Sequence, residues 1–320
     1  MRCVSTPALI ALDWGTTSLR AYLLDESGQV CDHQASPLGI TRLATGGFSA
    51  TLDGVIGRWR AAHPGLTIVA SGMVGSRAGW VEAPYLPCPV SLESLAASLV
   101  DVPYHDGVVQ IVPGLAWHQR GEADVMRGEE TQVLGALSDV ATATDALFVL
   151  PGTHSKWVRT SGVTLAEFVT YPTGEMYELL LTKSTLGQLH EDGGDLALHD
   201  QAGFARGLDR GFRHAGDSLG KLFGVRARAL LGDIKATDVA AYLSGLLIGS
   251  ELRDAFVRFV PPAKAHPPIG IIADPALAQA YAAAFALAEV ACFLVRPDAA
   301  ARGIAAIAGN SAGNSAGTGA

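Results

Sequence analysis

Apolar residues along the chain form short runs typical of buried strands, which alternate with longer stretches of helical spacing. Near the start, three short runs separated by turn residues predict an antiparallel meander over residues 8–12, 19–24 and 30–34. Helices are expected over residues 48–62, 92–99, 129–137, most of 176–256 with a break near 191–194, and 275–287. Further strands are expected over residues 67–70, 108–112, 145–150, 156–159, 163–170 and 269–273. This alternation predicts an α/β fold.

One pattern occurs twice: an apolar strand, a Gly-Thr-x-Ser turn, a second strand and a Ser-Gly turn, over residues 8–28 and again over 146–162. A repeated unit predicts two domains of related topology, although two ordinary hairpins with similar turns are the alternative. We expect an N-terminal domain over residues 1–120 and a C-terminal domain over 121–297. A helix over 298–308 is expected to pack back on the first domain, ahead of a flexible Gly/Ser/Asn/Ala-rich tail over 309–320.

Composition narrows the classes of function. Hydrophobic residues make up 49% of the chain and charged residues 17%, so sizeable cores can form. The net charge of −8 argues against nucleic acid or an anionic membrane as the main partner. The apolar runs are too short to span a bilayer, and the four cysteines have neither disulfide-like nor zinc-like spacing. We therefore expect a cytoplasmic protein with a small-molecule partner.

Two loops rich in glycine and hydroxyl residues are candidate phosphate-binding sites. Glycine lets the backbone approach a phosphate, and N–H and hydroxyl groups donate hydrogen bonds to it. An ordinary polar turn is the alternative for either loop alone, but a pair, one in each domain, predicts a triphosphate held from both sides. The first loop offers Gly15, Thr16, Thr17 and Ser18, preceded by Asp13 as a candidate Mg²⁺ ligand, and the second offers Gly152, Thr153, His154, Ser155 and Lys156.

Other candidate residues lie between and after the two loops. Glu129 and Glu130 open a predicted helix, and either could act as a general base. The alternative is that both acids only stabilise the positive end of the helix dipole. The sequence does not choose between these roles or between the two residues. Candidate contacts for a carboxylated substrate are Ser71, Arg77 and Arg127. The candidate adenosine contact, for which an ordinary strand-to-helix turn is the alternative, is Ala273, Asp274 and Pro275.

Along the chain, the motifs follow one another as phosphate loop, acidic helix start, second phosphate loop and strand-to-helix turn. This order resembles the actin-like ATPase domain of sugar kinases. Several long strings are more specifically similar to the 2-dehydro-3-deoxygalactonokinase family, and they span nearly the whole chain: residues 13–20, 71–77, 79–85, 124–132, 151–157 and 242–249. The sequence departs from the family at Asp274, where glycine or another small residue is more usual.

The resemblance implies two ribonuclease-H-like domains with the active site in the cleft between them, and ATP and Mg²⁺ as cofactors. It implies transfer of a phosphoryl group from ATP to the 6-hydroxyl of 2-dehydro-3-deoxy-D-galactonate, in D-galactonate breakdown. Glu129 or Glu130 would deprotonate that hydroxyl, and Arg77 or Arg127 would hold the carboxylate. A kinase for another sugar acid and a nucleotide-binding protein without transfer are the alternatives. A homodimer, and the preference between galactonate- and gluconate-derived substrates, stay open.

Overall fold

The computed structural model describes residues 6–44, 46–119, 121–140, 145–192, 197–214, 218–260 and 268–317. The chain forms two compact units. The first unit contains Met1–Thr144, Thr160–Phe168 and Arg296–Ala320, and the second contains Asp145–Arg159 and Val169–Val295. Each unit has a mixed sheet and a hydrophobic core of its own.

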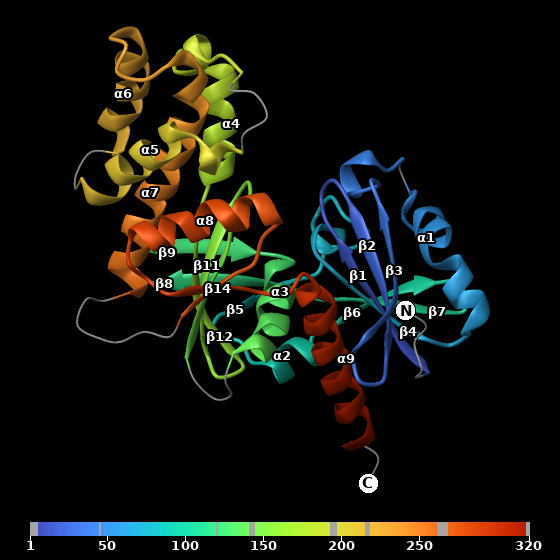
Figure 1. Ribbon diagram of the computed structural model, residues 1–320. Coiled ribbons are helices and arrows are strands. Elements are labelled where there is room, and N and C mark those ends of the chain that lie inside the picture. The colour runs from blue at the N-terminus through green and yellow to red at the C-terminus, as the bar shows by residue number, and fades with distance from the viewer. Residues whose placement is uncertain are drawn as a thin grey trace. The chain divides into compact units, whose positions relative to one another are not determined.

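The first unit is built on a six-stranded sheet with the order β3-β2-β1-β4-β7-β6 (Figure 1). The predicted meander is confirmed, because β2 pairs antiparallel with both β1 and β3. Strands β1, β4 and β7 run parallel, so their carboxyl ends share one edge of the sheet. The bounds are β1 Pro7–Trp14, β2 Leu19–Asp25, β3 Val30–Ser36, β4 Thr67–Ser71, β6 Val100–Tyr104 and β7 Gly107–Ile111.

A helix and a small second sheet complete much of this unit. Helix α1 (Phe48–Ala62) has the predicted bounds and buries Leu52, Ile56 and Trp59, which recur at the three-to-four-residue spacing of one helix face. The three-stranded sheet, order β5-β8-β9, was not predicted. Its strands are short or polar on one face, namely β5 Tyr85–Pro87, β8 Gly114–Gln119 and β9 Glu122–Met126.

Helix α9 (Ala299–Gly317) packs on α3 (Glu129–Ala136), on β1 and on β4. Helices α3 and α9 approach so closely that a Cβ atom on Gly135 or Gly303 would collide with the backbone of the other helix. Helix α3 belongs to the first unit, whose first segment ends at Thr144, whereas the sequence led us to expect the first domain to end at residue 120. Helix α9 also includes residues 309–317, which the sequence led us to assign to a flexible tail.

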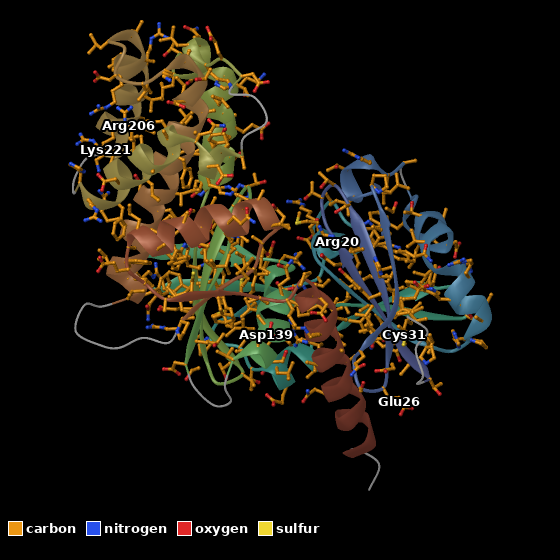
Figure 2. The ribbon with its side chains drawn as sticks, in the orientation of Figure 1. Arg20, Glu26, Cys31, Asp139, Arg206 and Lys221 are labelled. Atoms are coloured by element: carbon orange, nitrogen blue, oxygen red, sulfur yellow. The ribbon has the colours of Figure 1, made fainter. Side chains whose placement is uncertain are left out.

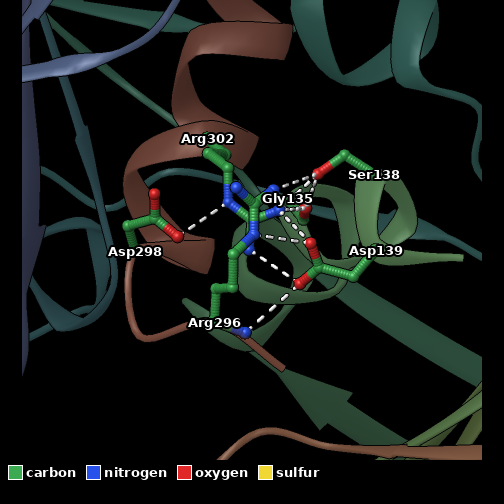
Figure 3. Close-up of polar contacts among 6 residues, drawn as sticks. All are labelled: Gly135, Ser138, Asp139, Arg296, Asp298 and Arg302. Carbon is green, nitrogen blue, oxygen red and sulfur yellow. Dashed lines mark hydrogen bonds and ion pairs between the residues drawn. The ribbon is translucent and has the colours of Figure 1, made fainter. Parts of the chain in front are cut away.

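An ion-pair cluster ties α9 to the end of α3 (Figure 3). Arg302 donates to the Gly135 carbonyl at 2.7 Å, which satisfies one of the free carbonyl groups at the end of α3. Asp139, in the η3 turn (Leu137–Asp139) after α3, accepts hydrogen bonds from both Arg302 and Arg296. The short helix α2 (Leu92–Ala96) also contacts α9.

The second unit repeats the topology of the first. Its five-stranded sheet has the order β12-β11-β10-β13-β14, in which β10, β13 and β14 run parallel. This matches the order β3-β2-β1-β4-β7 and agrees with the repeat seen in the sequence. The far end of the β11–β12 hairpin, Thr160–Phe168, is counted with the first unit. The bounds are β10 Ala146–Leu150, β11 Ser155–Ser161, β12 Thr164–Tyr171, β13 Ile269–Ile271 and β14 Cys292–Leu294.

The helices of the second unit include a glycine-mediated pair, α5 (Ala202–Arg213) and α7 (Val239–Phe259). Glycines on α5 face the α7 backbone and glycines on α7 face the α5 backbone, so that no Cβ fits at Gly203, Gly207, Gly211, Gly245 or Gly249. The other helices are α4 Thr173–Lys183, α6 Ser218–Leu230 and α8 Pro275–Leu287. Part of the break expected near 191–194 lies outside the described residues. No helix in the described part of the chain is long and apolar enough to cross a membrane.

Candidate functional site

The carboxyl ends of two parallel strands, β1 and β4, place the first candidate residues side by side. Asp13 is the register partner of Ser71. Gly72 follows β4 with a φ of 98°, and a Cβ there would lie 2.9 Å from the Trp14 carbonyl oxygen. Gly128 precedes α3 with a φ of 108°, and its Cβ would lie 3.1 Å from the Gly72 Cα. Glycine is therefore required at both positions for these backbone segments to meet.

The first loop predicted to bind phosphate connects β1 to β2. It closes with a hydrogen bond from the Gly15 N–H to the Ser18 carbonyl, at 2.9 Å. The Ile40 N–H donates to the Gly15 carbonyl at 3.1 Å and supports the loop from one side. Thr16 and Thr17 are exposed and Ser18 is half-buried. The loop thus presents hydroxyl groups on a backbone that neighbouring residues hold in place.

The two acids at the start of α3 have different environments. Glu129 is half-buried, and its Oε2 accepts a hydrogen bond from the Arg127 N–H at 3.0 Å. Glu130 has no exposed surface. Its Oε2 accepts from the Gly128 N–H at 2.6 Å, and its Oε1 accepts from Ser71 Oγ at 3.3 Å. Of the two carboxylates, Glu129 is the one that an external hydroxyl group can reach.

Three carboxylates in this region act on one another. Burial raises the pKa of Asp13, and Arg20, 3.6 Å away on β2, opposes that rise. The charge of Glu129 adds to the rise. Arg20 is labelled in Figure 2. Burial, together with the neighbouring Glu129, raises the pKa of Glu130 to about 8. The protonated form of Glu130 is therefore favoured at neutral pH.

The donor set suits a hard cation. Mg²⁺ in phosphoryl-transfer enzymes is bound through one or two carboxylates together with the phosphates of the nucleotide, and not by an all-protein cage. Among the described residues, no three His, Cys, Asp or Glu side chains form a group that could hold a metal ion. Asp13, at a strand end beside the first loop and within the field of Glu129, fits the carboxylate part of such a site.

The three candidate contacts for the substrate carboxylate differ in their exposure and in the hydrogen bonds that they already make. Ser71 is buried against Glu130 and lies 3.1 Å from Thr131 Oγ1, and Arg77 is exposed. Arg127 is 7% exposed, donates from Nη2 to the Ala83 carbonyl at 2.7 Å, and stacks on the ring of Tyr85 at 4.3 Å. Within the described structure its Nε and Nη1 have no hydrogen-bond partner. These two atoms are themselves buried, so Arg127 holds unpaired donors inside the protein, whereas the side chain of Arg77 is open to solvent.

The second predicted phosphate loop lies in the second unit, after β10. Thr153 and His154 are exposed, whereas Ser155 and Lys156 are buried at the start of β11. The first turn of α4 supports the loop: the Glu175 N–H donates to the Thr153 carbonyl at 3.0 Å, and Glu175 Oε2 lies 2.9 Å from His154 Nε2.

The predicted adenosine turn follows β13, which pairs parallel with β10, so the turn and the second loop extend from neighbouring strands. Asp274 is the N-cap of α8. Its Oδ1 accepts from the N–H groups of Ala276 and Leu277 at 3.0 and 3.2 Å, and Pro275 occupies the first turn of the helix. The carboxylate that departs from the family pattern therefore has a local role.

Thr131 was not predicted as part of the site. Its hydroxyl donates to the Gly128 carbonyl at 2.7 Å and contacts Ser71, so it links the start of α3 to the end of β4. A threonine three residues into a helix is a weak signal, because such a hydroxyl commonly bonds to the preceding turn of its own helix.

The fold is shared with solved structures. The activator of 2-hydroxyisocaproyl-CoA dehydratase from Clostridium difficile superposes with a TM-score of 0.53 at 11% identity, over 98% of both chains. A solved structure from Sinorhizobium meliloti, assigned by its name to the 2-dehydro-3-deoxygalactonokinases, superposes with a TM-score of 0.85 at 33% identity, over 96% of this chain and 99% of that one. The chain therefore shares its mixed α/β fold with both structures.

Sequence relatives define the family. Residues 13–307 match the model of the 2-keto-3-deoxy-galactonokinase family. The 2-dehydro-3-deoxygalactonokinase of Escherichia coli (strain K12) is 39% identical over 77% of this chain and 80% of its own length. A probable 2-dehydro-3-deoxygalactonokinase of Rhizobium meliloti is 38% identical over 77% and 79%. The chain belongs to the 2-keto-3-deoxy-galactonokinase family.

Proposed function

We propose that this chain transfers the γ-phosphoryl group of ATP to the 6-hydroxyl of 2-dehydro-3-deoxy-D-galactonate, giving the 6-phosphate and ADP in D-galactonate breakdown. The observation that carries the proposal is the group formed by Asp13, Glu129 and Glu130 at the strand ends of the first unit, in a chain that belongs to a sugar-acid kinase family. Phosphoryl transfer depends on positioning and on charge stabilisation, and these residues supply both.

Glu129 is the proposed general base. A base must come within hydrogen-bond reach of the hydroxyl from which it takes the proton, and Glu130 has no exposed surface. Because Glu130 holds its own proton, it does not add a second negative charge beside the base. Its hydrogen bonds to Gly128 and Ser71 hold the start of α3 against β4.

The phosphates of ATP are proposed to contact both loops. Thr16, Thr17 and Ser18 in the first unit, and Thr153 and His154 in the second, are accessible donors. Mg²⁺, held in part by Asp13, would offset the charge that develops on the phosphoryl oxygens. The two loops would then contact the same nucleotide, in a cleft between two ribonuclease-H-like domains. Residues 273–275 would lie beside the adenosine.

The substrate carboxylate is assigned to Arg127. Its Nε–H and Nη1–H groups are buried without a hydrogen-bond partner, which a bound carboxylate would satisfy, and its stacking on Tyr85 fixes the guanidinium plane. Arg77, which is exposed, is the alternative contact, and unlike Arg127 it has no contact in the described structure that fixes its guanidinium plane.

The test is ADP release with ATP and Mg²⁺ and a panel of 2-keto-3-deoxy sugar acids. We expect turnover with the galactonate-derived acid well above the rate with ATP alone. No acceleration by any acid in the panel, in a protein that still binds ATP, would overturn the proposed function. Faster turnover with the gluconate-derived acid would keep the kinase and change its substrate.

A further inference from the structure

A buried acid outside the residues discussed so far lies at the centre of a hydrogen-bond network in the second unit. Glu251, on α7, is 4% exposed. Its Oε1 accepts hydrogen bonds from Ser155 Oγ at 2.7 Å and from Trp157 Nε1 at 2.8 Å. Its Oε2 accepts from Tyr281 Oη at 2.7 Å and from Thr173 Oγ1. Four side chains thus donate to one carboxylate.

The donors come from the elements that carry the second half of the proposed nucleotide site. Ser155 ends the second phosphate loop and begins β11. Thr173 begins α4, whose first turn supports that loop through the bond from Glu175 to Thr153. Tyr281 lies on α8, the helix that follows the adenosine turn. Glu251 therefore connects the loop, the start of α4 and α8.

Packing stability alone does not account for a charged group at this position. Taking a carboxylate out of water is unfavourable, and apolar side chains of similar volume commonly stabilise a core at least as well. Burial raises the pKa of Glu251, and the four hydrogen bonds act against that rise. A carboxylate can accept from four donors at once, whereas a neutral amide offers one accepting oxygen. The four hydrogen bonds to Glu251 fix the positions of the elements that carry the donors.

We propose that Glu251 is a positioning residue for ATP: it fixes Ser155 and Thr173 so that the exposed part of the second loop and the first turn of α4 hold their donors ready for phosphate. The inference rests on the proposed function and goes beyond it, because it places a determinant of nucleotide affinity on α7. The Ser155 hydroxyl then serves Glu251, and Thr153 and His154 are left as the accessible donors of the loop.

The proposal is tested with Glu251→Gln and Thr173→Val, using Asp254→Asn as a matched control. Asp254 lies one turn further along α7 and accepts from Tyr171 Oη at 2.6 Å in an exposed position. The glutamine preserves the side-chain volume but forces some of the four donors to reorient, and the valine removes one donor alone. The readouts are the dissociation constant for ADP by calorimetry, the KM values for ATP and for the sugar acid, and Tm.

We expect both test variants to weaken ADP binding and to raise the KM for ATP by roughly 10- to 100-fold, because small misplacements of binding groups have effects of that size. The KM for the sugar acid and the properties of Asp254→Asn should change little. ADP binding unchanged in both test variants would overturn this inference alone. A wild-type protein that binds no nucleotide would overturn the proposed function as well. If Glu251→Gln fails to fold, Thr173→Val decides. A lower Tm together with a similar rise in both KM values in that variant would show a purely structural role.

Discussion

At the scale of single residues, neighbours in the sequence have different chemistry because their surroundings differ. Glu129 and Glu130 are adjacent acids, and the sequence gives no reason to choose between them. The structure separates them by burial: Glu130 is enclosed and retains its proton, whereas Glu129 remains accessible. Successive side chains of a helix point about 100° apart around its axis, so one of two adjacent residues commonly faces inward.

This difference predicts unequal effects of two conservative substitutions. Glu129→Gln should lower kcat by roughly 100- to 10,000-fold, the range expected for removing a general base. Glu130→Gln should lower it far less, because the amide is neutral like the protonated acid and can retain bonds to Gly128 and Ser71. Steady-state rates with saturating ATP and sugar acid would check this. A larger loss in Glu130→Gln than in Glu129→Gln would assign the base to Glu130.

The two arginines allow a second paired test. Arg127→Gln should raise the KM for the sugar acid by about 10- to 100-fold with little change in the KM for ATP, because a hydrogen bond to a charged group contributes about 1.5–3 kcal/mol. Arg77→Gln, at an exposed position, is the matched control and should change neither value. If Arg127→Gln lowered only Tm, Arg127 would be a structural contact of Ala83 and Tyr85.

At the scale of elements, the sequence predicted those marked by a continuous apolar run or by regular helical spacing of apolar residues. Helices α1 and α8 have the predicted bounds, and the strands β1 to β4 lie where the apolar runs are. The β8–β9 pair was missed because β9 is mostly exposed and carries polar residues, so no apolar alternation marks it. Strand β14, of three residues, is too short to give a periodic signal.

Hydrophobic periodicity did not predict the contact between α5 and α7. The contact itself predicts that a side chain added at its glycines lowers the free energy of unfolding. Gly207→Ala should lower the free energy of unfolding by about 1–3 kcal/mol, because the new methyl group meets the α7 backbone at Tyr242. Gly224→Ala on α6 is the control: a Cβ there meets nothing within 4 Å. Alanine in that helix should stabilise by up to about 1 kcal/mol. Urea unfolding of both variants would measure the contrast, and equal effects would refute the close contact.

At the scale of the whole molecule, the first unit is assembled from segments far apart in the chain. Sequence patterns report on neighbours along the chain. They therefore do not show directly where the first domain ends, which we expected near residue 120, or what the last helix packs against. Helix α9 returns to the first unit and meets α3 at a cluster of charges, where Asp139 binds Arg296 and Arg302 across more than 150 residues of sequence. The start of α3 carries the proposed base, and its end is fixed by the last segment of the chain.

This cluster makes the stability of the first unit depend on pH. Burial raises the pKa of Asp139, but the hydrogen bonds from Arg302 and Arg296 lower it more, so that its pKa lies below the usual value. The folded protein therefore binds this proton less readily than the unfolded chain does. The stabilisation is complete above the unfolded pKa of about 3.9 and is lost as the pH falls through the lower, folded value.

Asp139→Asn should therefore lower the free energy of unfolding at pH 7 by about 1–3 kcal/mol, since it replaces charge-assisted hydrogen bonds with weaker ones. The deficit relative to the wild type should shrink as the pH falls below about 4, because the wild-type carboxylate is then protonated as well. Urea unfolding at a series of pH values from 7 to 3 measures this convergence. Asp298→Asn is the control. Asp298 directly precedes α9 and accepts from Arg302 at 2.9 Å, so this contact does not join α9 to α3. A deficit in Asp139→Asn that stayed constant down to pH 3 would show that the ion pairs with α9 do not hold the end of α3 in place.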